Sequence, residues 1–134
     1  MYQVLIVDDE PFVRQGLKVV IDWESYGFHI AAEAKNGIEA IEYLKKSKFD
    51  LIFMDIRMPG MNGLEVSAKI RKSISKRVKI VLLSGYSEFT YAQEALKYNI
   101  SNYLLKYVDV SKFNKEISLS ATTIERWYYR YKKF

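Results

Sequence analysis

Acidic side chains stand at the ends of two apolar stretches of the sequence. Asp8, Asp9 and Glu10 follow the first apolar stretch, and Asp55 follows the third. If these carboxylates lie together, their mutual repulsion must be relieved by a retained proton or by a cation. An all-oxygen set of ligands without histidine or cysteine favours a hard cation. Mg²⁺ suits such a set because it also keeps sites for water and phosphate oxygens. The acids therefore indicate a magnesium site.

Two further polar residues end later apolar stretches. Ser84, which is followed by a glycine, ends the fourth stretch, and Lys106 ends the fifth. A hydroxyl and an ammonium that face one phosphate suit phosphoryl transfer, in which positioning and charge neutralisation do most of the catalysis. A carboxylate is also a known nucleophile for phosphate. This chemistry assigns the acceptor role to Asp55, which stands at the tip of a buried strand.

Each of these features has a plainer explanation when it is taken alone. Acids after a strand often stabilise the start of the next helix through its dipole. A lysine after a strand is commonly a solvated end residue, and Ser-Gly is commonly a turn. The functional interpretation depends on their combination, because every one of them stands at a strand end.

The elements that must position these residues alternate along the chain. Apolar runs predict buried strands, and the amphipathic stretches between them predict helices. This alternation predicts a flavodoxin-like, doubly wound α/β fold, in which five parallel strands take the order 2-1-3-4-5 and are accompanied by five helices. In such a fold the polar residues at the strand ends share one edge of the sheet. The expected strands are 4–7, 28–34, 50–54, 79–84 and 101–106, and the expected helices are 11–23, 36–48, 63–73, 87–99 and 109–118 or beyond.

Composition limits the class of protein. A chain of 134 residues, of which 49% are hydrophobic, suits one globular domain. The absence of cysteine excludes a disulfide framework. No apolar run approaches the roughly 20 residues of a membrane span, and the first residues lack the pattern of a signal peptide. A cytoplasmic protein without membrane contact is therefore expected.

The carboxyl end is basic and carries a short heptad pattern. Residues 111–134 hold six Lys and Arg against two acids, which supplies +4 of the net charge of +5. Such a tail can contact nucleic acid or an acidic surface, or it can be a solvated helix face. We expect 119–134 to extend the last helix, either for dimerisation or as a linker toward an effector domain; a frayed end is the alternative. The heptad positions are Ile117, Ala121, Ile124, Tyr128 and Tyr131.

Four motifs together resemble a known family. VLIVDDEP, FMDIRMPGMNG, VLLSGYSEF and YLLK are similar to the motifs of receiver domains of bacterial two-component response regulators. The resemblance covers roughly residues 2–118, and we take residues 1–118 as the receiver domain. The segments IDWESYGFHIAAEAKNG and SGYSEFTYAQEAL further resemble receivers that are joined to AraC-type helix-turn-helix regulators.

The resemblance implies a phosphoacceptor and a metal site. Asp55 would accept a phosphoryl group from a phosphohistidine of a sensor histidine kinase. Asp9, Asp55 and the backbone carbonyl of Arg57 would bind Mg²⁺ directly, and Asp8 would act through a bound water. The domain would assist its own phosphoryl transfer and dephosphorylation, and it would be a phosphoacceptor signalling domain, not an enzyme.

The resemblance also implies a switch. Lys106 would pair with the phosphoryl oxygens, and Ser84 would donate its hydroxyl to them. Tyr103 matches an aromatic position that moves inward in active receivers, although an edge-of-core aromatic is the alternative. The face formed by the fourth helix, fifth strand and fifth helix would then change and form a homodimer.

One position departs from the family pattern. Receivers usually have proline after the lysine, with a cis peptide bond, whereas this chain has Tyr107. A cis bond before a residue other than proline costs about 2.5–4 kcal/mol, so we expect a trans Lys106–Tyr107 bond and a rerouted loop. This loop would aim Lys106 less well.

Two other classes of protein with a similar sheet fit this sequence less well than a receiver does. Phosphatases with an aspartyl nucleophile on a similar sheet place a second Asp two residues on, where this chain has Arg57, and an arginine cannot act as that acid. An FMN-binding flavodoxin needs a Ser, Thr and Gly phosphate loop after the first strand, where this chain has acids. A phosphorylation-independent interaction module and a stand-alone receiver remain alternatives. DNA binding is expected only through an effector domain absent from this chain.

Overall fold

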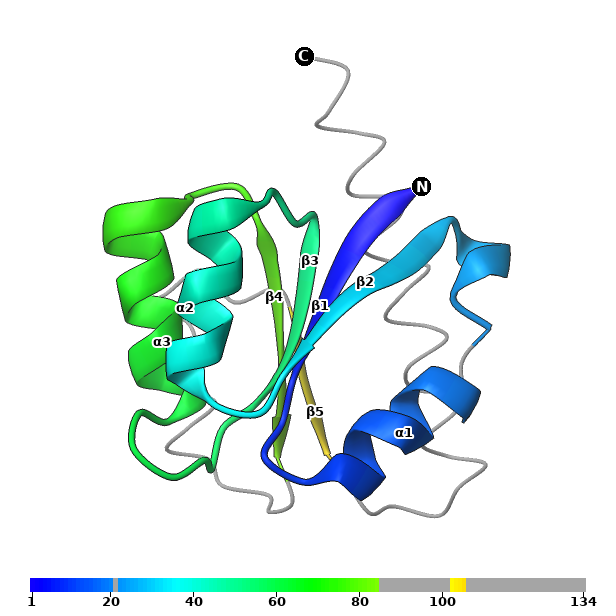
Figure 1. Cartoon of the computed structure of the whole chain (residues 1–134), viewed down its shortest axis with the longest axis horizontal. Helices are drawn as coiled ribbons and strands as arrows, with labels where there is room; N and C mark the ends of the chain where they lie inside the picture. The colour runs from blue at the N-terminus through cyan, green and yellow to red at the C-terminus, as the bar shows by residue number, and fades with distance from the viewer. Residues whose placement is uncertain (21, 85–101, 106–134) are drawn as a thin grey trace.

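The computed structural model describes residues 1–20, 22–84 and 102–105 (Figure 1). The five strands in these ranges form one sheet in the order β2-β1-β3-β4-β5, and every neighbouring pair is parallel. Consecutive strands that are not hydrogen-bonded neighbours require crossovers, as a doubly wound sheet does. The strands are β1 (Tyr2–Val7), β2 (Phe28–Ala34), β3 (Leu51–Asp55), β4 (Lys79–Ser84) and β5 (Asn102–Leu105).

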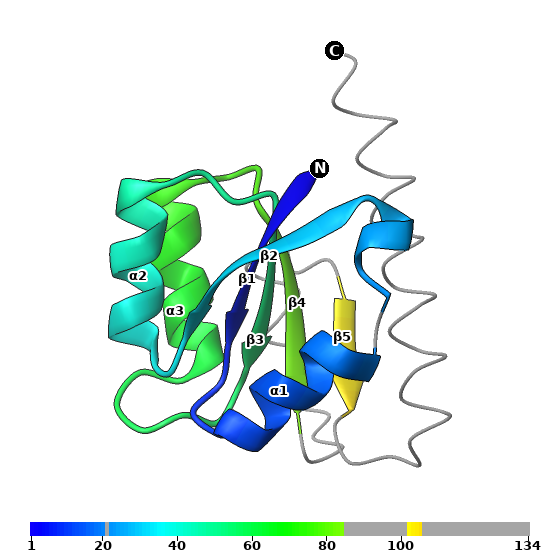
Figure 2. The same ribbon diagram turned by 45° about the vertical axis from the view of Figure 1, so that its right-hand side comes forward.

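Helices cover both faces of the sheet. Helices α2 (Gly37–Lys46) and α3 (Gly63–Lys69) lie side by side on one face, and α1 (Pro11–Val20) lies on the other (Figures 1 and 2). A short 3₁₀ turn, η1 (Glu24–Tyr26), precedes β2, and a π-helical turn, η2 (Ile70–Ile74), continues α3. The predicted flavodoxin-like parallel α/β fold is confirmed.

Two hydrophobic cores explain why the strands are almost continuously apolar. Successive side chains of a strand point to opposite faces of the sheet. In β1, Leu5 and Val7 join the core beneath α2 and α3, whereas Val4 and Ile6 join the core beneath α1. Both faces of the sheet are therefore shielded from water, as parallel sheets require.

Side-chain caps fix where α2 and α3 begin. The Asn36 side chain accepts a hydrogen bond from the Glu39 backbone N–H at 2.9 Å and so caps the start of α2. Asn62 and Glu65 form a reciprocal capping box at the start of α3. Since Asn62 follows the loop after β3, this box also holds that loop beside Asp55.

All three α-helices that the structure describes end earlier than expected, and α2 ends at Lys46 instead of residue 48. Helix α1 ends at Val20 instead of residue 23, and the indole of Trp23 donates a hydrogen bond to the Leu17 carbonyl at 2.9 Å. The α-helical part of α3 ends at Lys69 instead of residue 73, because the Ser75 N–H reaches back five residues to the Ile70 carbonyl. The α-helical hydrogen-bond pattern is replaced there by one wide π turn.

Several predictions lie outside the described residues. These are the helices at 87–99 and from 109 onward, the Lys106–Tyr107 peptide bond and the tail at 119–134. Within the ranges that the structure describes, no helix is long and apolar enough to cross a membrane.

The first residue of β4 makes stability depend on pH. Burial, with a smaller contribution from the charge of Arg71, lowers the pKa of Lys79 from 10.5 to about 8. Between these two values the unfolded chain binds more protons than the folded protein, so the free energy of unfolding rises with pH. We expect a rise of about 1–2 kcal/mol between about pH 8 and about pH 10.

Urea unfolding at about pH 8 and about pH 10 would measure this rise. The Lys79→Met variant should lose it, whereas Lys76→Met, at an exposed lysine three residues earlier, should keep it. An equal rise in Lys79→Met would assign the pH dependence to other groups.

Candidate functional site

The carboxyl ends of β1 and β3 bring the predicted acids together. Val7 of β1 pairs with Met54 of β3, so the residues that follow them, Asp8 and Asp55, are neighbours at the edge of the sheet. The Asp8 N–H donates to the Ala34 carbonyl at 3.1 Å and continues the hydrogen bonding between β1 and β2. The position of Asp8 is thus set by backbone pairing.

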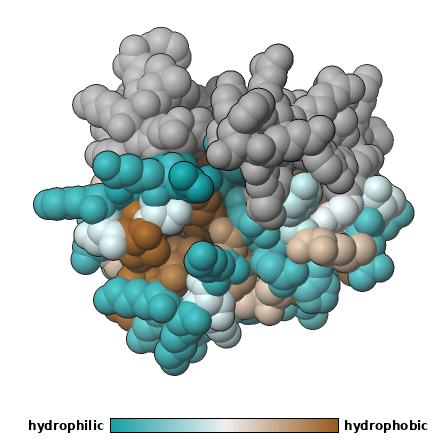
Figure 3. Space-filling view, turned by 90° about the horizontal axis from the view of Figure 1, so that it is seen from above, coloured by the Kyte–Doolittle hydropathy of each residue, from teal (hydrophilic) through white to brown (hydrophobic). Residues whose placement is uncertain are grey.

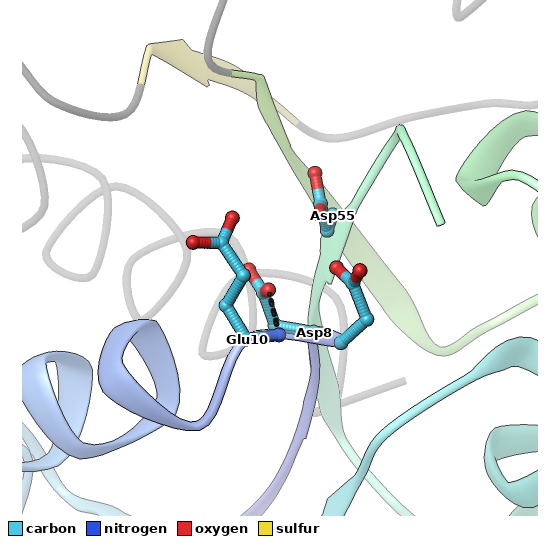
Figure 4. A group of neighbouring side chains, drawn as sticks. Asp8, Glu10 and Asp55 are labelled. Carbon is cyan, nitrogen blue, oxygen red and sulfur yellow. Dashed lines mark hydrogen bonds between the residues drawn. The ribbon is translucent and has the colours of Figure 1, made fainter. Parts of the chain in front are cut away.

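Four carboxylates gather at this edge. Asp8, Asp9, Glu10 and Asp55 each contribute an oxygen atom, and these four atoms all lie within 4.8 Å of one another. Asp8 and Asp55 are buried, at 0% and 4% exposure, whereas Glu10 is exposed. Figure 4 shows Asp8 and Glu10 after the end of β1, with Asp55 beside them at the end of β3. This donor set has the chemistry that a hard divalent cation requires.

Backbone N–H groups orient the two buried acids. The Glu10 N–H donates to Asp8 Oδ1 at 2.9 Å, drawn as a dashed line in Figure 4. The Arg57 N–H donates to Asp55 Oδ1 at 3.3 Å. In both cases the donor lies two residues after the acid, as in an Asx turn. Hydrogen bonds from N–H groups favour the charged form of a carboxylate, which is the form that binds a cation.

Arg14 of α1 holds the backbone of the acidic segment. Its guanidinium Nη1 donates to the Asp8 carbonyl at 2.6 Å, and its Nε pairs with Glu33 Oε1 of β2 at 3.3 Å. Lys18, one turn later, pairs with the other oxygen of Glu33 at 2.8 Å. Arg14 therefore ties the start of α1 to the ends of two strands.

We expect the Arg14→Gln substitution to lower the free energy of unfolding by about 1–2 kcal/mol, because the Asp8 carbonyl loses a charged donor. The matched Lys18→Gln substitution removes the same charge and only an ion pair, so it should cost less than about 0.5 kcal/mol. Urea denaturation of both variants would measure the difference. Equal losses would show that the bond to Asp8 contributes nothing beyond the ion pairs with Glu33.

The loop after β3 packs tightly against Asp55. The Gly63 N–H donates to the Ile56 carbonyl at 2.7 Å, and the Ile56 N–H donates to the Leu83 carbonyl at 3.0 Å. A Cβ atom at Gly63 would overlap the Asp55 carbonyl oxygen. Gly60 has a φ of 82°, a left-handed conformation that glycine adopts without strain. A side chain at position 63 would therefore force this loop or the end of β3 to move.

The remaining predicted site residues lie on neighbouring strands. Leu83 pairs with Asp55, so Ser84 at the end of β4 comes one residue later at the same edge. Tyr103 lies in β5 and pairs with Leu82, and Leu105 pairs with Ser84. Lys106, which follows β5 in sequence, lies outside the described residues.

Three features of the site were missed by sequence reasoning. Glu10 stands at the strand end in the sequence, but it is not among the predicted metal ligands. Its adjacency to Asp8 and Asp9 was a usable signal. The contact between Gly63 and Asp55, and the bond from Arg14 to Asp8, had no comparable signal, since each depends on how distant segments pack.

The fold and site together define a flavodoxin-like α/β domain with a candidate cation site at the carboxyl ends of β1 and β3. The response regulator receiver domain family matches residues 4–118. The chain is 42% identical over 106 residues to the transcriptional regulatory protein YesN of Bacillus subtilis. The matched region covers 79% of this chain and 28% of YesN. It is 36% identical over 109 residues to the transcriptional regulatory protein HptR of Staphylococcus aureus, covering 81% of this chain and 42% of HptR.

Solved structures agree with this match. The receiver domain of AraT, a response regulator from Geobacillus stearothermophilus, is 34% identical with a TM-score of 0.78, and the comparison covers 93% of this chain and 96% of that one. The response regulator domain of Thermotoga maritima CheB is 28% identical with a TM-score of 0.81, covering 94% and 97%. This chain belongs to the response regulator receiver domain family. It is a signalling domain of two-component systems, and it spans less than half the length of YesN or HptR.

Proposed function

We propose that Asp55 accepts a phosphoryl group from a phosphohistidine of a sensor histidine kinase, and that the modified domain controls the output of a transcriptional regulator. One observation carries the proposal. Asp55 is a buried carboxylate at the carboxyl end of β3, and its oxygen lies within 4.8 Å of oxygens from three other acids. Membership of the receiver family and the naming of YesN and HptR as transcriptional regulators support it.

The chemical step is a transfer between two residues. A carboxylate oxygen of Asp55 forms a bond to phosphorus while the bond from phosphorus to the histidine nitrogen breaks, and the electron pair of that bond returns to the imidazole. The Arg57 N–H, which donates to Asp55 Oδ1, keeps the carboxylate in a fixed orientation for this attack. Burial among other acids makes a counter-charge necessary.

Mg²⁺ is the cation that the four carboxylates fit best. When bound, it neutralises negative charge on the phosphoryl oxygens and on the acids. We propose that Asp9, Asp55 and the backbone carbonyl of Arg57 hold it directly and that Asp8 acts through a water. The position of Asp8 is held by hydrogen bonds to its N–H, its Oδ1 and its carbonyl.

The switch is assigned to residues on β4 and β5. Lys106 would pair with the phosphoryl oxygens, Ser84 would donate its hydroxyl to them, and Tyr103 would move with the change. The strand pairing supports this assignment, because Ser84 and Leu105 are partners at the edge that carries Asp55. We further propose that helices at 87–99 and 109–118 complete a five-helix receiver over 1–118.

The longer relatives suggest where the signal goes. We propose that the face formed by the fourth helix, β5 and the fifth helix, or the tail at 119–134, forms a homodimer after phosphorylation. DNA contact would come from an effector domain such as a transcriptional regulator carries, and a cytoplasmic location follows from the proposed kinase partner. An AraC-type effector stays a prediction.

Acetyl phosphate with Mg²⁺ tests the proposal without the kinase. Intact mass should show one added phosphoryl group, and chelation of Mg²⁺ should prevent it. Trypsin releases residues 49–57 as one peptide, FDLIFMDIR, and the modification should map to Asp55 within it. Light scattering on a sizing column would then show whether the modified protein dimerises.

No mass gain, in protein that is shown to bind Mg²⁺, would contradict the phosphoacceptor function. It would favour the alternative of a phosphorylation-independent interaction module. A mass gain that maps to Asp50 would also contradict the assignment to Asp55.

A further inference from the structure

A groove lies between α2 and η2, away from the acidic site. It has a volume of about 590 Å³ and is lined by residues of both helices. Helix α2 begins beside the carboxyl ends of the strands and runs back toward their amino ends, so the groove at its last turn lies at the opposite end of the sheet from Asp55 (Figure 1). The lining residues are Ile41, Leu44, Lys45, Lys69, Lys72, Ser73 and Ile74.

The groove combines an apolar floor with a cationic rim. Ile41, Leu44 and Ile74 are wholly or partly buried and belong to the core beneath α2 and α3. The lysines of the rim are exposed, and none of them forms an ion pair with a residue that the structure describes. Figure 3 shows apolar surface among hydrophilic side chains on the side of the molecule that carries α2 and α3.

The sequence around the groove is rich in basic residues and poor in acidic ones. No acid occurs between residues 66 and 87, and this segment contains Lys69, Arg71, Lys72, Lys76, Arg77 and Lys79. The end of α2 adds Lys45, Lys46 and Lys48. Such a concentration of cations raises the local concentration of an anionic partner and speeds its association.

The π turn gives one wall of the groove its shape. The bond from the Ser75 N–H to the Ile70 carbonyl inserts an extra residue into the last turn, and Ser73 and Ile74 of this turn line the groove. π turns interrupt the regular hydrogen-bond pattern of a helix and occur frequently at functional sites. Here the turn widens the helix where the lysines meet the apolar floor.

We propose that the groove between α2 and η2 binds an acidic amphipathic helix of a partner protein. The apolar side chains of such a helix would cover Ile41, Leu44 and Ile74, and its carboxylates would face Lys45, Lys69 and Lys72. The apolar floor and the lysine rim would then each face complementary side chains of the partner, as in other complexes in which a helix lies in a hydrophobic groove. This binding is independent of Asp55.

A nucleic acid fits the groove less well. Its phosphates would match the lysines, but the aliphatic floor offers no aromatic side chain on which a base could stack. An acidic amphipathic helix would contact both the apolar floor and the lysine rim of the groove. The two classes of partner therefore differ in which surface residues their binding depends on.

Two synthetic peptides provide the probe. The first is a fluorescent amphipathic helix with leucine on one face and glutamate on the other, and the second has glutamine in place of every glutamate. Anisotropy titration should show binding of the first, weakening as salt is added, and about tenfold weaker binding of the second. A fluorescent single-stranded oligonucleotide is titrated in parallel.

A matched pair of triple variants locates the site. Lys45→Gln, Lys69→Gln and Lys72→Gln remove the rim, whereas Lys46→Gln, Lys48→Gln and Lys76→Gln remove the same charge from exposed lysines that do not line the groove. The rim variant should bind the glutamate peptide about tenfold more weakly, and the control should stay within about twofold of the parent. Both should keep the parent's thermal midpoint, and Asp55→Asn should bind as the parent does.

Equal weakening in the two triple variants would overturn the proposal, since the peptide would then sense only general charge. Tighter binding of the oligonucleotide, lost in the rim variant, would overturn it in favour of a nucleic-acid surface. Failure to bind the glutamate peptide would also overturn it. Amide shifts confined to α2 and η2 during titration would support it.

Discussion

The Asp55→Asn variant should gain no phosphoryl group from acetyl phosphate and Mg²⁺, under conditions that modify the parent protein. An amide oxygen is a far weaker nucleophile than a carboxylate, so the rate should fall by at least about a thousandfold. The fold should remain, because the side chains have the same shape and the asparagine oxygen can still accept the Arg57 N–H. Thermal stability should be equal or higher, since one charge leaves a group of four acids. Intact mass and a thermal melt measure the two effects.

The matched control is Asp50→Asn, which makes the same change just before the other end of the same strand. Asp50 Oδ2 accepts the Gln3 N–H at 2.7 Å, and an asparagine oxygen can do the same. This variant should be phosphorylated within about twofold of the parent rate, because it leaves the acidic cluster intact. If Asp55→Asn still gained a phosphoryl group, another carboxylate would be the acceptor. The rate of Asp50→Asn would then decide whether Asp50 is that acceptor.

The positions of the acids at the strand ends could be predicted from the sequence, because they follow from the regular alternation of strands and helices. Alternating apolar strands and amphipathic helices predict a parallel sheet, and a parallel sheet places the ends of β1 and β3 at one edge. The prediction that Asp8, Asp9 and Asp55 lie together needed nothing more, and the structure brings them together. The cap at Asn36 was also predictable, since a cap depends on residues only three positions apart.

The supports of the site could not be predicted in this way. The bond from Arg14 to the Asp8 carbonyl depends on how α1 packs beside the end of β1. The spacing of apolar residues predicts an α-helix up to residue 73, but the structure has a π turn from Ile70 to Ile74. Both the bond from Arg14 and the π turn depend on packing between elements. The hydrophobic pattern of one element does not indicate how its neighbours pack against it.

The two ends of the sheet differ in charge. The carboxyl ends of β1 and β3 carry four acids, whereas the turn before β4 and the end of α2 are rich in lysine and arginine. A cation at the acidic end and an anionic partner at the basic end would not compete for the same surface. The proposed phosphoryl transfer and the proposed groove can therefore be tested separately, with Asp55→Asn for one and the lysine variants for the other.

The Gly63→Ala variant should lose both stability and phosphorylation. The new methyl group would overlap the Asp55 carbonyl oxygen and press on Ile56, so the end of β3 or the start of α3 must move. Overpacking of this kind costs about 1–3 kcal/mol, although alanine is the better helix former. Any shift of the Asp55 backbone also moves the acceptor carboxylate, and misplacement by about 1 Å can slow a reaction by about a hundredfold. Urea unfolding and the rate of mass gain with acetyl phosphate measure the two losses.

Gly16→Ala is the matched control for this substitution. Gly16 lies within α1, and a Cβ atom there would meet nothing within 4 Å. The control should therefore gain about 0.5–1 kcal/mol from helix propensity and keep the parent rate of phosphorylation. If Gly63→Ala were as stable as Gly16→Ala, the loop after β3 would have to be pliable enough to accommodate the methyl group. If the variant had the parent's stability but was phosphorylated slowly, the loop would have accommodated the methyl group by displacing Asp55. That result would separate the role of Gly63 in aiming the acceptor from its role in packing.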